Sequence, residues 1–177
     1  MSTRSIIARK TEEGFAGVYH HWDGYPTALG QTLYRMYRHL ANNTTTNQTI
    51  PFLTELLIDE HPAGWSSING VDWTQPIGYV TGVDDNDAPQ CFCHGDRSEE
   101  GWVADQDSEC GAEFAYAFES SIEDETDLLH IYERQYGDGS HTMEFFGMTS
   151  SEGGWTLIKT IDLLGNEDID WENIGGL

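Results

Sequence analysis

Residues 5–40 read SIIARKTEEGFAGVYHHWDGYPTALGQTLYRMYRHL, and this stretch predicts two strands followed by a helix. We expect the first strand over Ser5–Lys10 and the second over Gly14–Trp22, with a short turn at Thr11–Gly14 between them. The next four residues, DGYP, form a turn whose proline fits the first position of the helix, because no N–H partner is needed there.

Two helices are expected in the first part of the chain, each from apolar residues that recur at helical spacing. The first covers Thr27–Leu40, and the second covers Ile50–His61, with Pro51 in its first turn and Pro62–Gly64 ending it. The apolar face of the first helix consists of Leu29, Leu33, Met36 or Tyr37, and Leu40. The apolar face of the second helix consists of Phe52, Leu53, Leu56 and Leu57.

The rest of the chain is rich in β-branched and aromatic residues separated by turns, as strands are. The strand candidates are Ile77–Val83, Gln90–His94, Ala112–Phe118, Leu128–Tyr136, His141–Met148 and Trp155–Leu163. The expected connections are loops at Trp65–Gln75 and Gly95–Cys110, a hairpin turn at Gly137–Ser140 and a closing turn at Asp168–Ile174. Early helices and late strands predict one α+β domain over residues 1–177, with an antiparallel sheet packed against the two helices.

The charge is distributed unevenly along the chain. The whole sequence has 31 acidic and 8 basic residues, a net charge of −23. Residues 1–50 contain three acids and five bases, a net of +2, whereas residues 51–177 contain 28 acids and three bases, a net of −25. Aromatic residues are plentiful, unlike in disordered acidic tails, so we expect a folded acidic protein.

This charge favours one class of partner and excludes others. Binding to a phosphate backbone or to an anionic membrane needs rows of Lys and Arg, so we expect no direct binding to nucleic acid or membranes. A basic protein surface is the natural partner, including one that normally holds nucleic acid. The alternative is that the acids serve only solubility or reflect an acidic proteome.

The acidic residues expected to bind such a partner fall in three clusters. They are Asp84, Asp85, Asp87, Asp96, Glu99, Glu100, Asp105, Asp107, Glu109, Glu123, Asp124, Glu125 and Asp127. On a strand, Asp105, Asp107 and Glu109 would share one face about 7 Å apart, a spacing similar to that of phosphates. These three also begin like a calcium loop, but Cys110 and Tyr116 occupy the positions of the glycine and the bidentate glutamate.

Cysteine usage and the N-terminus predict a cytoplasmic protein. Cys91, Cys93 and Cys110 are an odd number, which argues against a disulfide framework. The first residues, MSTRSIIARKTEEG, lack the apolar core of a secretory signal. No apolar run reaches the roughly 18 residues of a membrane span.

His20-His21-Trp22-Asp23 is the densest group of chemically active side chains, and it lies where a strand ends and a helix begins. An acid–base site would pair His20 or His21 with Asp23, whose carboxylate would orient the imidazole. The two histidines point to opposite faces of a strand, so they are a poor pair of metal ligands. In the structural alternative, Trp22 fills the core and Asp23 caps the turn or the helix.

Cys91, Cys93, His94 and Cys110 provide the ligand set of a zinc site, three thiols and an imidazole. Cys-x-Cys on a strand places both thiols on one face, but His94 then points away unless the strand ends there. Ordinary reduced cysteines of a core are the commoner explanation, so we expect no cofactor and keep zinc as the alternative. Zinc is the cofactor for which the sequence offers a ligand set, and nothing marks one cysteine as an activated nucleophile.

Two stretches resemble segments of small uncharacterised acidic proteins from phages and actinobacterial mobile elements. The first is HWDGYP at residues 21–26, followed by Gly30, and the second is CFCHGDR at residues 91–97. The resemblance covers about the first 40 residues and that second block. It implies a mobile-element context in which a small acidic protein inhibits a host defence, and it assigns no catalytic residue.

Two main hypotheses of function follow. The first is a non-enzymatic acidic interaction protein that acts as a nucleic-acid mimic on a basic protein in the host cytoplasm. The second is a small metal-assisted hydrolase, which needs His20 or His21, Asp23 and the Cys91–Cys110 region in one pocket. An accessory module without any site is a third interpretation.

Overall fold

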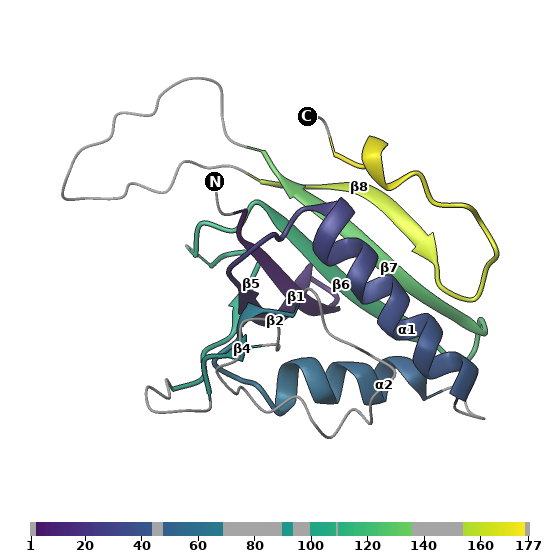
Figure 1. Ribbon diagram of the computed structural model, residues 1–177, viewed down its shortest axis with the longest axis horizontal. Coiled ribbons are helices and arrows are strands. Elements are labelled where there is room, and N and C mark those ends of the chain that lie inside the picture. Colours follow the sequence, from purple (N-terminus) through teal and green to yellow (C-terminus); the bar gives the residue numbers. More distant parts are fainter. Residues whose placement is uncertain are drawn as a thin grey trace.

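A mixed β-sheet with helices on one face forms the centre of the computed structural model (Figure 1). The structure describes residues 3–43, 48–68, 90–93, 100–108, 110–135 and 154–175. The strands are β1 (Ser5–Lys10), β2 (Phe15–His20), β3 (Trp65–Ser67), β4 (Gln90–Cys91), β5 (Ala104–Asp105), β6 (Phe114–Ser121), β7 (Thr126–Arg134) and β8 (Trp155–Asp162). The predicted α+β class is confirmed.

The described strands lie in the order β4-β3-β2-β1-β6-β7-β8, and β5 pairs with the outer edge of β2. The start of β2 pairs with β5 at Ala16 and Gly17, and its end pairs with β3 at His20. β1–β6 and β2–β3 are parallel pairs, whereas the sequence predicts an antiparallel sheet. Parallel neighbours need a long connection, and in both pairs the helices lie between the two strands in the chain.

The first helix begins at Pro26, as predicted, and starts with one wide turn. This turn, η1 (Pro26–Gly30), continues directly into α1 (Gln31–Asn43). The predicted apolar face is confirmed, because the buried residues are Leu29, Leu33, Met36, Tyr37 and Leu40. They pack against the sheet together with the second helix, which consists of α2 (Thr49–Thr54) and η2 (Glu55–Asp59).

One residue of the second predicted face is placed differently. Phe52 is 48% exposed, and Thr54 is buried instead. The Thr54 hydroxyl donates to the Ile50 carbonyl oxygen at 2.9 Å and accepts a hydrogen bond from Arg9 Nε at 3.0 Å. A polar side chain is tolerated in this position because its hydrogen bonds are made within the protein.

A loop segment, rather than a helix, covers the opposite face of the sheet. Ile6, Ala8 and Phe15 pack there against Ala104 and Ala112, which precede and follow the turn after β5. The alanines leave room for the segment to lie close to the strands. This face therefore has its own small core, separate from the one beneath the helices.

The short strands at the β4 end are the least predictable elements. Trp65–Gln75 is expected to be a loop, but its first three residues form β3. The expected strand at Gln90–His94 contains only the two residues of β4. The predicted elements at 77–83, 137–140 and 141–148 lie outside the described residues, and the structure pairs β7 directly with β8.

Candidate functional site

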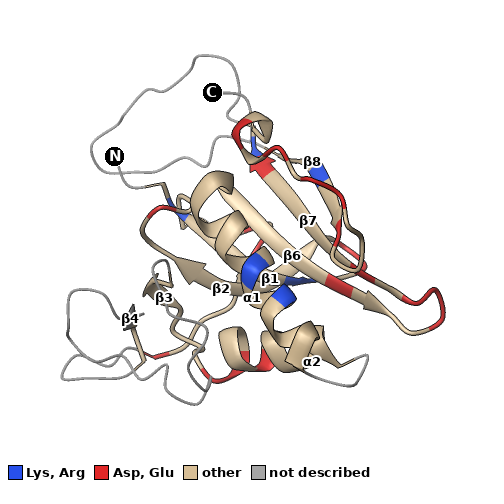
Figure 2. Ribbon diagram, turned by 45° about the vertical axis from the view of Figure 1, so that its right-hand side comes forward, with Lys and Arg blue, Asp and Glu red and all other residues tan. Residues whose placement is uncertain are grey.

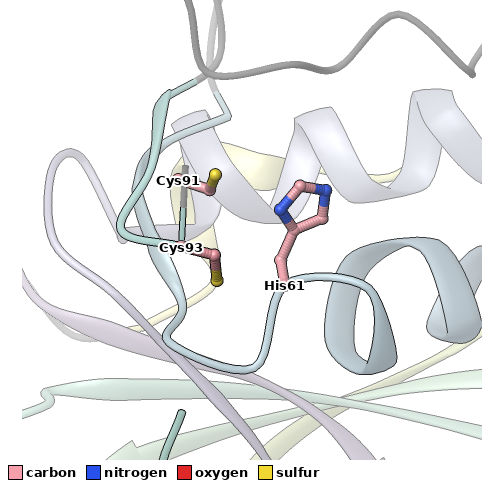
Figure 3. A group of neighbouring side chains, drawn as sticks. All are labelled: His61, Cys91 and Cys93. Carbon is pink, nitrogen blue, oxygen red and sulfur yellow. The ribbon is translucent and has the colours of Figure 1, made fainter. Parts of the chain in front are cut away.

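Two cysteines and a histidine meet beside the edge strand β4 (Figure 3). Cys91 ends β4, and Cys93 follows two residues later. His61 comes from the turn after η2 and lies opposite them. The ligand atoms, two Sγ and one imidazole nitrogen, all lie within 4.8 Å of one another. Cys91 and Cys93 therefore lie close together, although β4 ends at Cys91 and does not extend over both residues as the sequence predicts.

A tight turn at His61–Gly64 positions the imidazole. The Gly64 N–H donates to the His61 carbonyl oxygen at 2.9 Å, and Gly64 has a left-handed φ of +83°. A Cβ at Gly64 would lie 2.3 Å from the Tyr19 carbonyl oxygen, so only glycine fits. The Phe92 N–H donates to the Gly64 carbonyl oxygen at 3.0 Å, which joins the turn to the segment that carries both cysteines.

The cluster lies at the margin of the main core. His61 is buried, and its ring centroid is 4.2 Å from that of Trp65. Trp65 is fully buried, and its indole N–H donates to the Leu57 carbonyl oxygen at 2.8 Å. Cys91 is buried and Cys93 is half-buried. Packing against a fixed tryptophan therefore restricts the orientation of the imidazole.

The Cys93 thiol does not have the character of an activated nucleophile. Burial raises the pKa of Cys93, and hydrogen bonding from the Ala63 N–H partly opposes this shift. The Ala63 nitrogen lies 3.1 Å from Cys93 Sγ, and the Gly64 N–H also lowers the pKa of the thiol. An activated cysteine has a lowered pKa, so the environment argues against covalent catalysis.

The structure changes the predicted ligand set. Cys110 packs on the opposite face of the sheet with Ala112, so it cannot join Cys91 and Cys93. His94 lies outside the described residues. His61 supplies the imidazole instead. The sequence predicts His61 only as the last residue of the second helix and does not mark it as a ligand. The available signal was a histidine directly before the helix-ending Pro-Ala-Gly turn, upstream of the Cys-x-Cys pair.

His20 is a structural residue of the core. It is fully buried, and burial lowers its pKa to about 3, so the imidazole is neutral at pH 7. The Ile68 N–H donates to Nε2 at 3.2 Å, which places the ring proton on Nδ1, 3.3 Å from the Ser5 hydroxyl oxygen. Both ring nitrogens therefore connect β1 with the residue after β3, and His20 is not placed for acid–base chemistry.

His21 lies on the other face from His20, as expected for successive residues of an extended chain. Its Nδ1 is 2.7 Å from the Tyr19 hydroxyl oxygen. Tyr19 stacks on Phe92 with ring centroids 6.5 Å apart. Tyr19 packs with Phe15 on one face of the sheet, whereas Cys91 and Cys93 pack with the core beneath the helices on the other. His21 and the His61–Cys91–Cys93 cluster therefore lie on opposite faces, and the single pocket that a hydrolase needs is not formed by these residues.

Trp22 and Asp23 occupy the surface of the turn into the helix. Trp22 is 49% exposed, although the structural alternative places it in the core. Asp23 is exposed, with φ +53°, and the N-cap position belongs to Tyr25. The turn is joined to the sheet at Gly24, whose carbonyl oxygen accepts from the Tyr116 hydroxyl at 2.7 Å and whose N–H donates to the Thr3 carbonyl oxygen at 2.8 Å.

The predicted acidic residues separate into three groups. Those outside the described residues are Asp84, Asp85, Asp87, Asp96, Glu99 and Glu109. Those exposed to solvent are Glu100, Asp107, Glu123, Asp124 and Glu125. The remaining two, Asp105 and Asp127, are held by hydrogen bonds within the fold.

Asp105 and Asp107 do not alternate along a strand, so the predicted phosphate-like spacing is wrong for this pair. β5 ends at Asp105, and a turn follows. Asp105 Oδ1 accepts hydrogen bonds from the Asp107 N–H at 3.0 Å and from the Ser108 hydroxyl at 2.9 Å. Aspartate often forms such turns with its own side chain, which competes with strand formation.

Asp127 is buried, so its assignment to a binding surface is wrong. The Tyr37 hydroxyl donates to its Oδ2 at 2.6 Å, and the Ser120 hydroxyl donates to its Oδ1 at 2.6 Å. Burial and the hydrogen bond to Asp127 both raise the pKa of Tyr37, which keeps the phenol as a donor. Asp127 therefore fastens α1 to the start of β7.

Exposed acids gather at the β7–β8 edge of the sheet (Figure 2). The start of β7, directly after the β6–β7 turn, meets the segment after β8, because the Leu163 N–H donates to the Asp127 carbonyl oxygen at 2.8 Å. Arg38 Nη1 holds this segment through the carbonyl oxygens of Leu163 and Gly165, at 3.1 and 2.8 Å. The exposed residues, here named the acidic edge, are Glu123, Asp124, Glu125, Asp162, Glu167, Asp168, Asp170 and Glu172.

In comparisons with known proteins, no family model, curated protein or solved structure matches this chain. Among the described residues, the helices are all too short or too polar to cross a bilayer.

Proposed function

We propose that this chain is a non-enzymatic interaction protein that binds a basic, nucleic-acid-binding surface of another protein through its acidic edge. The observation that carries this proposal is the accumulation of eight exposed carboxylates at one edge of the sheet. The resemblance to mobile-element proteins suggests the purpose of such binding, which would be to inhibit a host defence protein. The proposal places the chain in the cytoplasm, where the reduced thiols at Cys91 and Cys93 would persist.

The acidic edge has little compensating positive charge among the described residues. Lys159 pairs with Glu167 at 3.4 Å. Arg38 donates to backbone carbonyl oxygens and to the Asn166 side chain of the same segment. Neighbouring carboxylates repel one another within a Debye length of about 8 Å. A basic partner relieves this repulsion, and the field of the edge accelerates and orients the encounter.

The hydrolase hypothesis has less support. It requires His20 or His21 to share a pocket with Asp23 and the cysteines. His20 is sealed in the core with a pKa lowered to about 3, and His21 faces away from the thiols. Interaction through charge needs no such convergence of side chains, so it agrees better with the described geometry.

The experiment compares two variants of equal net charge. In the edge variant, Glu123→Gln, Glu125→Gln, Asp168→Asn and Glu172→Gln remove four exposed charges from the acidic edge. In the control variant, Glu12→Gln, Glu13→Gln, Glu55→Gln and Glu60→Gln remove four exposed charges elsewhere. Both variants and the wild type are added to a panel of purified basic DNA- and RNA-binding proteins, each holding a fluorescent oligonucleotide.

We expect the wild type to displace the oligonucleotide from a subset of the panel, and the edge variant to need at least about tenfold more protein. The control variant should behave like the wild type, and the apparent affinity should fall steeply between low and high salt. Equal losses in both variants, or equal displacement from every basic protein, would show that the acids serve only net charge and would reject the proposal.

A further inference from the structure

We propose that His61, Cys91 and Cys93 form a zinc site that fastens the turn after η2 to the edge strand β4. This site is independent of the acidic edge, because the two lie at opposite ends of the strand order. The ligand set expected from sequence includes His94 and Cys110, whereas the proposed site has His61 in their place.

The three ligand atoms are close to the arrangement that zinc requires. With Zn–S and Zn–N bonds of about 2.3 and 2.0–2.1 Å, tetrahedral geometry separates neighbouring ligand atoms by about 3.5–3.8 Å. In this protein they all lie within 4.8 Å of one another. They therefore need to approach one another by only about 1 Å, which small side-chain rotations supply.

The chemistry of the ligands selects the metal. Two thiolates and an imidazole suit Zn²⁺, whereas Mg²⁺ and Ca²⁺ prefer oxygen ligands. The group of three contains no carboxylate. Three protein ligands fill three tetrahedral positions, and the fourth is open to water or to another donor.

The surroundings support a bound thiolate. The Ala63 N–H donates to Cys93 Sγ at 3.1 Å, so the turn that carries His61 also directs a hydrogen-bond donor at a ligand sulfur. Trp65 packs against the His61 ring at 4.2 Å, and the left-handed Gly64 fixes the path of the turn. Such contacts orient ligands and stabilise their charge once a metal is bound.

A metal link would be valuable at this position in the sheet. β4 has two residues, and its pairing with β3 changes register between Trp65 and Ser67. Ala63 and Cys93 are 30 residues apart in the chain. A metal bound by His61 and the two cysteines would therefore close a long loop. Closing such a loop lowers the entropy of the unfolded chain, and the zinc binds only when the site is assembled.

The first test uses wild-type protein that is purified under reducing conditions from zinc-supplemented cells. We expect one zinc per chain by elemental analysis. Removal of the metal with a chelator should lower the thermal midpoint by about 5–10 °C, and zinc should restore it. After replacement by Co²⁺, the near-ultraviolet spectrum should show thiolate-to-metal charge transfer, and X-ray absorption should show two sulfur ligands and one imidazole.

Variants then identify the ligands. Cys93→Ser and His61→Gln should lose the zinc and the metal-dependent shift of the thermal midpoint. The matched controls are Cys110→Ser, a thiol on the opposite face of the sheet, and His39→Gln, a histidine of α1. Both controls should retain one zinc and the full shift.

If His61→Gln fails to fold, Cys93→Ser and the wild-type absorption spectrum still decide the question, since Cys93 is half-buried. Three results would overturn the proposal: wild type without stoichiometric zinc after zinc loading, zinc that Cys93→Ser retains, or a Co²⁺ spectrum without thiolate ligands. Stoichiometric Cu⁺ in place of zinc would also reject the assignment.

Discussion

The β3–β4 end and the β7–β8 end of the sheet carry different kinds of chemistry. At the first end, His61, Cys91 and Cys93 are held within 4.8 Å of one another by a single turn and the core. At the second end, carboxylates are spread over a turn and an irregular segment and face solvent. Metal ligation depends on bond distances to within about 0.2 Å, whereas charge acts over a Debye length of roughly 8 Å.

This contrast predicts different tolerance to substitution. A small backbone shift at the first end separates the ligand atoms, because each metal bond has a narrow range of length. A similar shift at the second end leaves the total charge unchanged. Single substitutions should therefore have large effects near the metal ligands and small ones along the acidic edge, except where an acid is buried.

Gly64→Ala should have the largest effect, and it tests the rigid end directly. The new Cβ would lie 2.3 Å from the Tyr19 carbonyl oxygen, at a backbone φ of +83°. We expect a loss of about 3 kcal/mol or more in the free energy of unfolding, measured by urea denaturation, and loss of zinc. Gly154→Ala is the control, since a Cβ there meets no atom within 4 Å. A Gly64→Ala protein as stable as Gly154→Ala would contradict the account of this turn.

Asp127→Ala should have the next largest effect, and it tests the exception at the acidic end. The substitution removes the acceptor of the Tyr37 and Ser120 hydroxyls, which leaves the Tyr37 hydroxyl without its acceptor. We expect a loss of about 2–3 kcal/mol in urea denaturation.

Asp124→Ala is the matched control for Asp127→Ala, because Asp124 is an exposed acid of the turn that leads into β7. Its effect should stay within about 0.5 kcal/mol. Similar losses in the two variants would mean that burial does not distinguish Asp127 from the acidic edge.

A third prediction concerns pH and the core beneath the β3 end. The pKa of folded His20 is lowered to about 3, below the value of about 6.5 in the unfolded chain. The unfolded state therefore takes up a proton first as the pH falls from about 6.5 toward 3, and stability is lost over that window. Between pH 7 and 5 the loss from this residue should be about 2 kcal/mol.

The measurement compares urea denaturation of the wild type and His20→Gln at several pH values, because the difference cancels the titration of all other groups. The wild type should lose about 2 kcal/mol more than the variant between pH 7 and 5. Parallel pH profiles would show that His20 titrates normally in the folded protein.

The regular elements were predictable because their signals are local. Ser5–Lys10 is a strand as predicted, and Pro26 and the apolar face through Leu40 define the first helix. Phe52 was misplaced because a hydrogen-bonded threonine took the core position. β3 was missed because three residues carry too little periodicity for a strand to be recognised.

The candidate site was predictable only in part. Strand alternation predicts that Cys91 and Cys93 share a face, but β4 ends at Cys91, so their approach depends on the irregular segment that follows. The contribution of His61 depends on the contact between segments about 30 residues apart, as the hydrogen bond from Ala63 to Cys93 shows. Cys110 is also a thiol, so the sequence does not distinguish it from the other two cysteines, but it lies on the other face of the sheet.

The sequence by itself determined the α+β class, the two helices, the strong acidity of residues 51–177 and the presence of the Cys-x-Cys pair. Composition and short-range periodicity contain that information because side-chain chemistry and backbone geometry act locally. The tertiary structure alone decided that His20 and Asp127 are buried, that His61 joins Cys91 and Cys93, and that the exposed acids gather at one edge. These properties depend on which distant segments the sheet brings together, and pairing between strands is set by the packing of the whole chain.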